Sequence, residues 1–143
     1  MNGTIDKWGI VQLYVSALKK SAWIEAISLG YTLLEMQLRF LVKSKAGPSG
    51  QPLDDAVVEK CEYLMQVAVL ARDKGFLPQV LFEKVKSFNA ARIRAIHKLL
   101  TGTVTISELE AAASSVSPLY KEIQDLWLKI TLGPEQRIGE THA

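Results

Sequence analysis

Apolar residues recur every three or four positions along almost the whole chain, which is the spacing that places side chains on one face of an α-helix. Five such stripes follow one another, from Ile5 to Leu18, Trp23 to Leu41, Val57 to Ala71, Leu81 to Leu99 and Leu109 to Ile130. No stretch of useful length alternates between apolar and polar residues as a half-buried β-strand does. The pattern therefore predicts an all-α protein.

Turn-forming residues separate the stripes. The segment KAGPSGQP at positions 45–52, with two glycines and two prolines, is the clearest loop in the chain. TGTVT at positions 101–105 predicts a second turn, and residues 19–21 either break the chain or continue the first helix. Thr4 or Asp6 is expected to cap the start of that first helix.

The last stripe contains Pro118, which should kink or split its helix because proline lacks the backbone N–H that a helix uses. Gly133 and Pro134 should end that helix, which leaves about residues 134–143 as a frayed tail. The chain has 143 residues and no internal repeat. We therefore expect a single domain over residues 1–143, folded as a four- or five-helix up-and-down bundle.

Composition excludes several classes of protein. Lys and Arg number 17 against 15 Asp and Glu, a formal net charge of +2, which argues against a protein that coats polyanions. Cys61 is the single cysteine, so no disulfide within the chain is expected. The start lacks the layout of a signal peptide, and charged residues interrupt the most apolar region. We expect a soluble, cytoplasmic protein that does not insert into a membrane.

Neither a metal nor a cofactor is expected. The two histidines are His97 and His142, and His142 lies near the end of the expected tail, so the pair makes no zinc site. The segment GPSG at positions 47–50 lacks the lysine and the strand–helix context of a phosphate-binding loop.

Basic charge is concentrated in the fourth expected helix. From Glu83 to Lys98 there are five basic residues and one acidic residue, which gives +4 in a chain whose total is +2. Arg92 falls on the same apolar stripe as Leu99, so its side chain must reach solvent, pair with an acid or face a pocket. Glu35, near the stripe of the second expected helix, is the candidate acidic partner.

The segment FNAARIRAIHKLL, residues 88–100, holds Arg92 and His97 in the spacing Arg-x4-His. On a late helix of a four- or five-helix bundle, this motif resembles the HEPN superfamily, small helical proteins with many ribonuclease members. LGYTLLEMQLRFLV, residues 29–42, resembles the long second helix of that family, with Glu35 as its acidic residue. The resemblance implies a metal-independent endoribonuclease and a homodimer in which two motifs face one cleft. The resemblance also implies a role as the toxin of a toxin–antitoxin pair. The partner of such a toxin would be an antitoxin or a nucleotidyltransferase that neutralises it.

These residue types suit the cleavage of RNA. RNA carries its own nucleophile, the 2′-hydroxyl, so an enzyme needs only to move protons and to stabilise charge on the phosphate. Histidine changes its charge near neutral pH, so His97 is the expected acid–base catalyst. Arg92 offers a planar fork of donors to phosphate oxygens. Further contacts to RNA phosphates are expected from Asn89, Arg94, Lys98 and Lys86.

Two other functions stay open. Members of the family often carry a polar residue directly after the arginine, and Ile93 holds that position here. Ile93 favours a non-catalytic module that binds RNA, a nucleotide or a protein partner. The third alternative is a plain helical interaction protein whose basic helix is a solvated edge. The large rings of the first two helices either fill the core or form an apolar dimer face; they are Trp8, Tyr14, Trp23, Tyr31 and Phe40.

Overall fold

The computed structural model describes residues 4–43 and 52–141, with side chains up to residue 129. Seven α-helices make up this part of the chain: α1 (Lys7–Lys19), α2 (Trp23–Val42), α3 (Asp55–Glu59), α4 (Leu64–Asp73), α5 (Gln79–Leu100), α6 (Ile106–Ser114) and α7 (Val116–Thr141). The described residues contain no strand, which confirms the all-α class. Of the loop expected at residues 45–52, residues 45–51 lie outside the described residues and only Pro52 lies within them.

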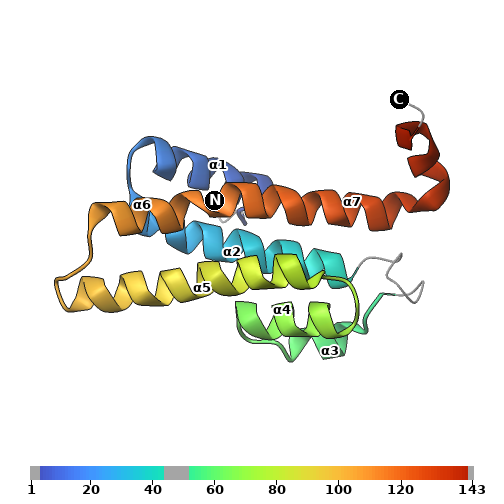
Figure 1. The fold of residues 1–143 in the computed structure, drawn as a ribbon, viewed down its shortest axis with the longest axis horizontal. Coiled ribbons are helices and arrows are strands. Elements are labelled where there is room, and N and C mark those ends of the chain that lie inside the picture. The colour runs from blue at the N-terminus through green and yellow to red at the C-terminus, as the bar shows by residue number, and fades with distance from the viewer. Residues whose placement is uncertain (1–3, 44–51, 142–143) are drawn as a thin grey trace.

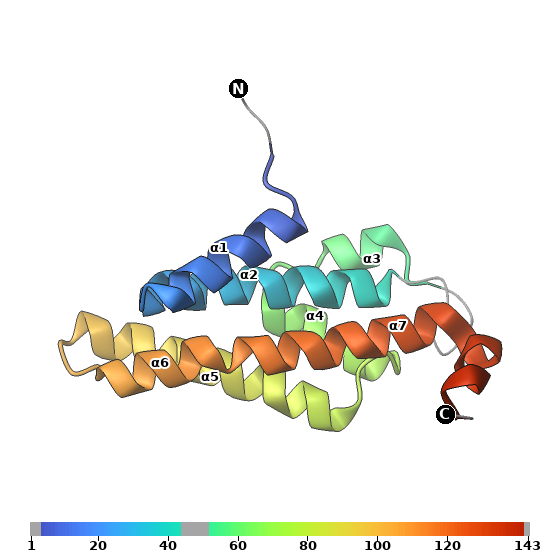
Figure 2. The same cartoon turned by 90° about the horizontal axis from the view of Figure 1, so that it is seen from above.

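Helix α2 is the centre of the bundle. It packs against α1, α4, α6 and α7, and Figures 1 and 2 both show α1 and α5 on opposite sides of it. Its buried side chains include Leu33, Leu34, Leu38 and Leu41. Helix α5 lies beside α6 and α7 and runs in the opposite direction, while α4 lies along only the first half of α5 (Figure 1).

The start of the chain resolves both alternatives left open by its sequence. Asp6 caps α1, because its Oδ1 atom accepts a hydrogen bond from the backbone N–H of Gly9 at 2.8 Å. Helix α1 ends at Lys19, and the chain turns through Ser21, whose φ of 57° lies in the left-handed region. Residues 19–21 therefore break the helix.

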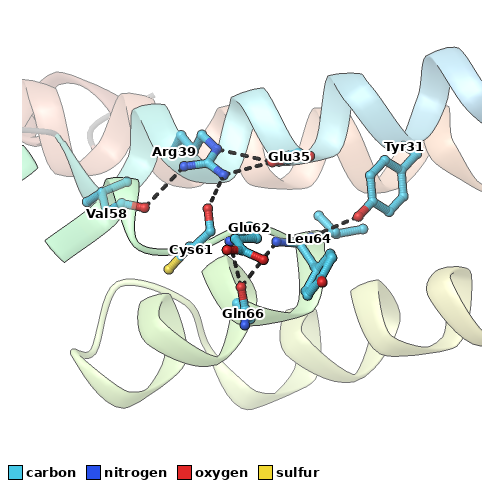
Figure 3. A network of polar contacts seen from close by, with 9 residues as sticks. Tyr31, Glu35, Arg39, Val58, Cys61, Glu62, Leu64 and Gln66 are labelled. Carbon is cyan, nitrogen blue, oxygen red and sulfur yellow. Dashed lines mark hydrogen bonds and ion pairs between the residues drawn. The ribbon is translucent and has the colours of Figure 1, made fainter. Parts of the chain in front are cut away.

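The single helix expected over residues 57–71 is wrong, because this segment forms α3, a bend and then α4. Arg39 of α2 holds the bend. Its Nη1 atom donates to the carbonyl oxygen of Val58 at 3.2 Å, and its Nη2 atom donates to that of Cys61 at 2.7 Å (Figure 3). Carbonyl groups that a continuous helix would use internally are thus bound by a side chain from another helix.

Side chains also satisfy the backbone at the start of α4. The Oε1 atom of Gln66 accepts a hydrogen bond from the N–H of Glu62 at 2.6 Å. The hydroxyl of Tyr31, on α2, accepts one from the N–H of Leu64 at 3.0 Å (Figure 3). The first N–H groups of a helix have no partner inside it, so these contacts stabilise a new helix at this point.

Pro118 splits the last expected helix, as predicted, since α6 ends at Ser114 and α7 begins at Val116. The hydroxyl of Tyr14, on α1, donates to the carbonyl oxygen of Ala113 at 2.6 Å. This buried hydrogen bond fixes α1 to the end of α6, next to the split.

Helices α2 and α7 approach closely at Gly30. A Cβ atom added to Gly30 would lie 2.5 Å from Cγ2 of Val116, which is too close for two carbon atoms. The absent side chain of Gly30 therefore makes room for Val116, which is fully buried.

The helix end expected at Gly133 and Pro134 is wrong, since α7 continues to Thr141 and includes most of the expected tail. A proline inside a helix removes one hydrogen bond and bends the axis without having to end the helix. Helix α7 bends sharply near its C-terminal end in both views (Figures 1 and 2).

The large rings of α1 and α2 divide between buried and exposed positions. Tyr14 is buried, and Trp23 and Tyr31 pack against the core. Trp8 and Phe40 are 69% and 49% exposed. Core packing therefore accounts for the first three rings and not for Trp8 or Phe40.

Candidate functional site

Arg92 lies in the second half of α5, and its side chain turns toward α2. Its guanidinium carbon lies 4.2 Å from the centroid of the Tyr31 ring, a cation–π contact. Its Nη2 atom is 3.4 Å from Oδ1 of Asn89, at the long limit of a hydrogen bond. Its Nε atom is buried and has no hydrogen-bond partner among the described residues. No carboxylate among the described side chains forms an ion pair with Arg92.

The expected pairing of Arg92 with Glu35 is not formed. The Oε1 atom of Glu35 accepts from Nη2 of Arg39 at 2.8 Å and from Nε of Arg39 at 3.3 Å (Figure 3). Glu35 and Arg39 are four residues apart on one helix, so their side chains are neighbours on its surface. This local partner occupies Glu35, and the aromatic ring of Tyr31 takes the place beside Arg92.

His97 lies in the last turn of α5, and its side chain is exposed. Its imidazole forms no hydrogen bond with the described residues, whereas its backbone carbonyl accepts from the N–H of Thr101 at 3.2 Å.

Within one molecule, Arg92 and His97 do not converge. Five residues of an α-helix correspond to about 140° of rotation and about 7.5 Å of rise. Arg92 turns inward to Tyr31, while His97 faces solvent. One copy of the chain therefore presents the two expected catalytic groups at different places on the surface of α5.

Three apolar side chains lie between Arg92 and His97 around the axis of α5. Ile93, Ile96 and Leu100 are 54%, 42% and 81% exposed. In an ideal helix these three residues point within about 60° of one another, inside the arc from Arg92 to His97. We call Ile93, Ile96 and Leu100, with the flanking Arg92 and His97, the motif face. Helix α4 lies along only the first half of α5 (Figure 1), whereas the residues of the motif face belong to the second half.

The four expected phosphate-binding residues separate into three groups. Asn89 contacts Arg92. Lys86 is exposed and forms no ion pair with the described residues. Lys98 is bound to Glu108 of α6, with Nζ 3.0 Å from Oε1, and Arg94 lines a groove between α5, α6 and α7. Lys98 and Arg94 therefore lie toward α6 rather than beside Arg92.

Sequence reasoning missed the role of Tyr31 in holding Arg92. The available signal was its position four residues before Glu35, which places the two side chains on one face of α2. If Glu35 faced the motif, as the sequence suggested, then Tyr31 would face it too, because the two residues lie one turn apart on the same side of α2.

The described residues contain no group of three or more His, Cys, Asp or Glu side chains placed to hold a metal ion. In the same part of the chain, no helix combines the length and the apolar character required to cross a membrane.

Comparisons of the chain with protein-family models, with curated proteins and with solved structures found no match. Function must therefore be inferred from the motif residues and from the helix that carries them.

Proposed function

We propose that the protein is a HEPN-like, metal-independent endoribonuclease that acts as a homodimer through Arg92 and His97. The observation that carries this proposal is the state of Arg92. Its half-buried guanidinium is stacked on Tyr31 and has no carboxylate partner among the described residues. Charged groups in partly buried positions are normally paired, so an oriented, unpaired guanidinium suits an anion that arrives from outside, such as an RNA phosphate.

The proposed reaction needs no cofactor. The 2′-oxygen of RNA attacks the adjacent phosphorus, and the bond from phosphorus to the 5′-oxygen breaks. A base removes the proton of the 2′-hydroxyl, and an acid protonates the departing 5′-oxygen, with His97 supplying one of these roles. Arg92 stabilises the charge that builds on the non-bridging oxygens. The products are a 2′,3′-cyclic phosphate and a 5′-hydroxyl.

A homodimer accounts for the motif face. Ile93, Ile96 and Leu100 expose apolar surface directly beside Arg92, where a binding site for RNA alone would be polar. Two copies that bury these side chains against each other also bring His97 of one copy near Arg92 of the other. The distance between the two groups within one copy then no longer limits catalysis.

The test is cleavage of a mixed RNA pool in the presence of EDTA. Wild-type protein is expected to cleave it and leave cyclic-phosphate ends, while His97→Ala and Arg92→Ala lower the rate at least about a hundredfold. His142→Ala, at the other histidine of the chain, is the control for His97. Arg72→Ala is the control for Arg92, because Arg72 also stacks on a ring, 4.1 Å from the centroid of Phe82. Full activity in both motif variants would refute the site.

Ile93 favours a second candidate, a non-catalytic module that binds RNA, a nucleotide or a protein partner. This side chain is 54% exposed and adds no polar group where the motif often has one. The second candidate predicts salt-dependent RNA binding that Arg92→Ala weakens, with no cleavage at high protein concentration.

We further propose that the protein acts as the toxin of a toxin–antitoxin pair, as its resemblance to the HEPN superfamily implies. Expression of the wild-type chain is expected to arrest growth of a bacterial host, and His97→Ala is expected to relieve the arrest. An antitoxin or nucleotidyltransferase that neutralises the protein would restore growth with the wild-type chain.

A further inference from the structure

A groove with a volume of about 820 Å³ runs between α5 on one side and α6 and the start of α7 on the other. It lies on a different face of α5 from Arg92, which turns toward α2. The two groups proposed to carry out the cleavage of RNA, Arg92 and His97, do not line the groove, although Arg94 and Lys98, two of the expected contacts to RNA phosphates, do.

Small side chains form the hollow. Ser87 and Ala91 of α5 line one wall, and Ala111 and Ser115 line the other. Where two helices pack through such short side chains without touching along their whole length, space remains between them. Larger apolar side chains close the bottom, among them the buried Phe88 and Leu119.

Two ion pairs join the walls at opposite ends of the groove. Lys84 Nζ lies 2.9 Å from Oε1 of Glu122, and Lys98 Nζ lies 3.0 Å from Oε1 of Glu108. Lys98 follows Lys84 by fourteen residues, and Glu108 precedes Glu122 by fourteen. Both pairs therefore fit one antiparallel alignment of the two walls. The two ion pairs are about 21 Å apart along α5.

These pairs neutralise four of the six charged residues that line the groove. Glu83 and Arg94 remain. Glu83 Oε1 accepts a hydrogen bond from Nε2 of Gln79 at 2.8 Å, while Arg94 forms neither a hydrogen bond nor an ion pair with the described residues. Within that part of the chain, Arg94 and Glu83 are thus the two charges of the groove without an ion pair, since the amide of Gln79 carries no charge. They are eleven residues apart, about 17 Å along α5, so Arg94 lies between the two ion pairs as a cation without a carboxylate partner beside it.

We propose that this groove binds a single-chain amphiphile with an anionic head group. The guanidinium of Arg94 binds the carboxylate or phosphate oxygens of the head, for which its planar donors are suited. The hydrocarbon chain lies on Phe88, Leu119 and the alanines of the walls. A volume of about 820 Å³ lies in the range of small-molecule sites.

Isothermal titration calorimetry tests this site with three probes below their micelle-forming concentrations: dodecanoate, dodecyl phosphate and the uncharged dodecyl maltoside. At least one anionic probe is expected to bind with a stoichiometry of one, and more tightly than the maltoside. The tighter of the two anionic probes identifies the head group as carboxylate or phosphate.

Variants locate the binding. Arg94→Gln is expected to weaken the anionic probe about tenfold, from the loss of a charged hydrogen-bond donor. Lys121→Gln, an exposed cation on α7 that does not line the groove, should leave the affinity unchanged. Ala111→Phe fills the groove and should abolish binding of every probe. The proposal is overturned by the absence of binding by both anionic probes, by equal affinity in Arg94→Gln, or by unchanged affinity in Ala111→Phe.

Discussion

Arg92 of the motif and Tyr31 of the central helix α2 form a cation–π contact, with 4.2 Å from the guanidinium carbon to the ring centroid. The same ring carries a hydroxyl that accepts from the N–H of Leu64 at 3.0 Å. One side chain of α2 therefore orients the arginine of the motif with its face and the start of α4 with its edge.

The two roles of Tyr31 can be separated by substitution. Tyr31→Phe keeps the ring but removes the hydroxyl, so the free energy of unfolding should fall by about 1 kcal/mol while RNA binding is retained. Tyr31→Leu removes the ring face as well, so Arg92 loses its support and RNA binding should weaken several-fold. Chemical denaturation and a binding titration of both variants measure the two effects. Equal RNA affinity in Tyr31→Leu and wild type would contradict the orienting role.

Arg39 should be sensitive to a change that preserves its charge. Its guanidinium binds Glu35 and the carbonyl oxygens of Val58 and Cys61, all three at once. The single ammonium group of Arg39→Lys cannot reproduce this geometry, so a loss of about 1–3 kcal/mol in the free energy of unfolding is expected. Arg94→Lys, at an exposed arginine that forms no ion pair with the described residues, should change it by less than about 0.5 kcal/mol.

Gly30→Ala should destabilise the protein although alanine favours helices. The new methyl group would meet Cγ2 of Val116 at 2.5 Å, and overpacking of this kind costs about 1–3 kcal/mol. Combining it with Val116→Ala should cost less than the sum of the single changes, because the smaller side chain removes the collision. Gly9→Ala is the control, since its nearest neighbour, Ile5, is exposed and able to move. Simple additivity in the double variant would exclude the collision.

Tyr14→Phe should lower the free energy of unfolding by about 1–2 kcal/mol at neutral pH, because it leaves the buried carbonyl of Ala113 without its donor. Burial raises the pKa of Tyr14 above its ordinary value, against a smaller opposing effect of its contact with Ser117. The folded state thus favours the neutral phenol. This stabilisation is complete below a pH of about 10 and is lost as the pH rises through the folded-state pKa.

The difference in stability between wild type and Tyr14→Phe should therefore shrink as the pH rises above about 10. The two proteins differ at position 14 alone, so the difference between them isolates this phenol. Urea denaturation at neutral and alkaline pH measures it, with the exposed Tyr63→Phe as the control. A difference that grows with pH would contradict the assigned cause.

Spacing of apolar residues was sufficient to predict the all-α fold, and α2 buries its predicted stripe from Ile27 to Leu41. The stripe predicted for α1 is wrong in its facing, because Trp8 and Val15 are exposed while Tyr14 and Ala17 are the buried residues of that helix.

The spacing failed between α3 and α4, where the stripe through Cys61 continues but the helix does not. At the break, backbone groups are bound by Arg39 and Tyr31, which belong to α2. A tertiary contact of this kind leaves no trace in the local pattern of residues 57–71.

The placement of the motif on one helix was predictable, whereas the contacts of its residues were not. The order of residues in α5 placed Arg92 and His97 on one helix. The partner of Arg92 was misjudged because Glu35 has a nearer cation, Arg39, one turn away on α2. Local ion pairs of this kind form without any cost of bringing distant segments together, so they compete well against long-range pairs.

Helix α5 is one continuous helix with two different surroundings, since α4 supports its first half and leaves the second half open on that side (Figure 1). Backbone amides in the second half should therefore exchange with deuterium through local opening of the helix. Amides in the first half should exchange more slowly, because their exchange requires more complete unfolding. Any molecule that docks on the motif face would slow exchange at residues 93–100 before it changed the average structure. The rate of amide exchange in this half of α5 therefore reports binding to the motif face. It does so equally for RNA, for a second copy of the chain and for an antitoxin, before the bound molecule has been identified.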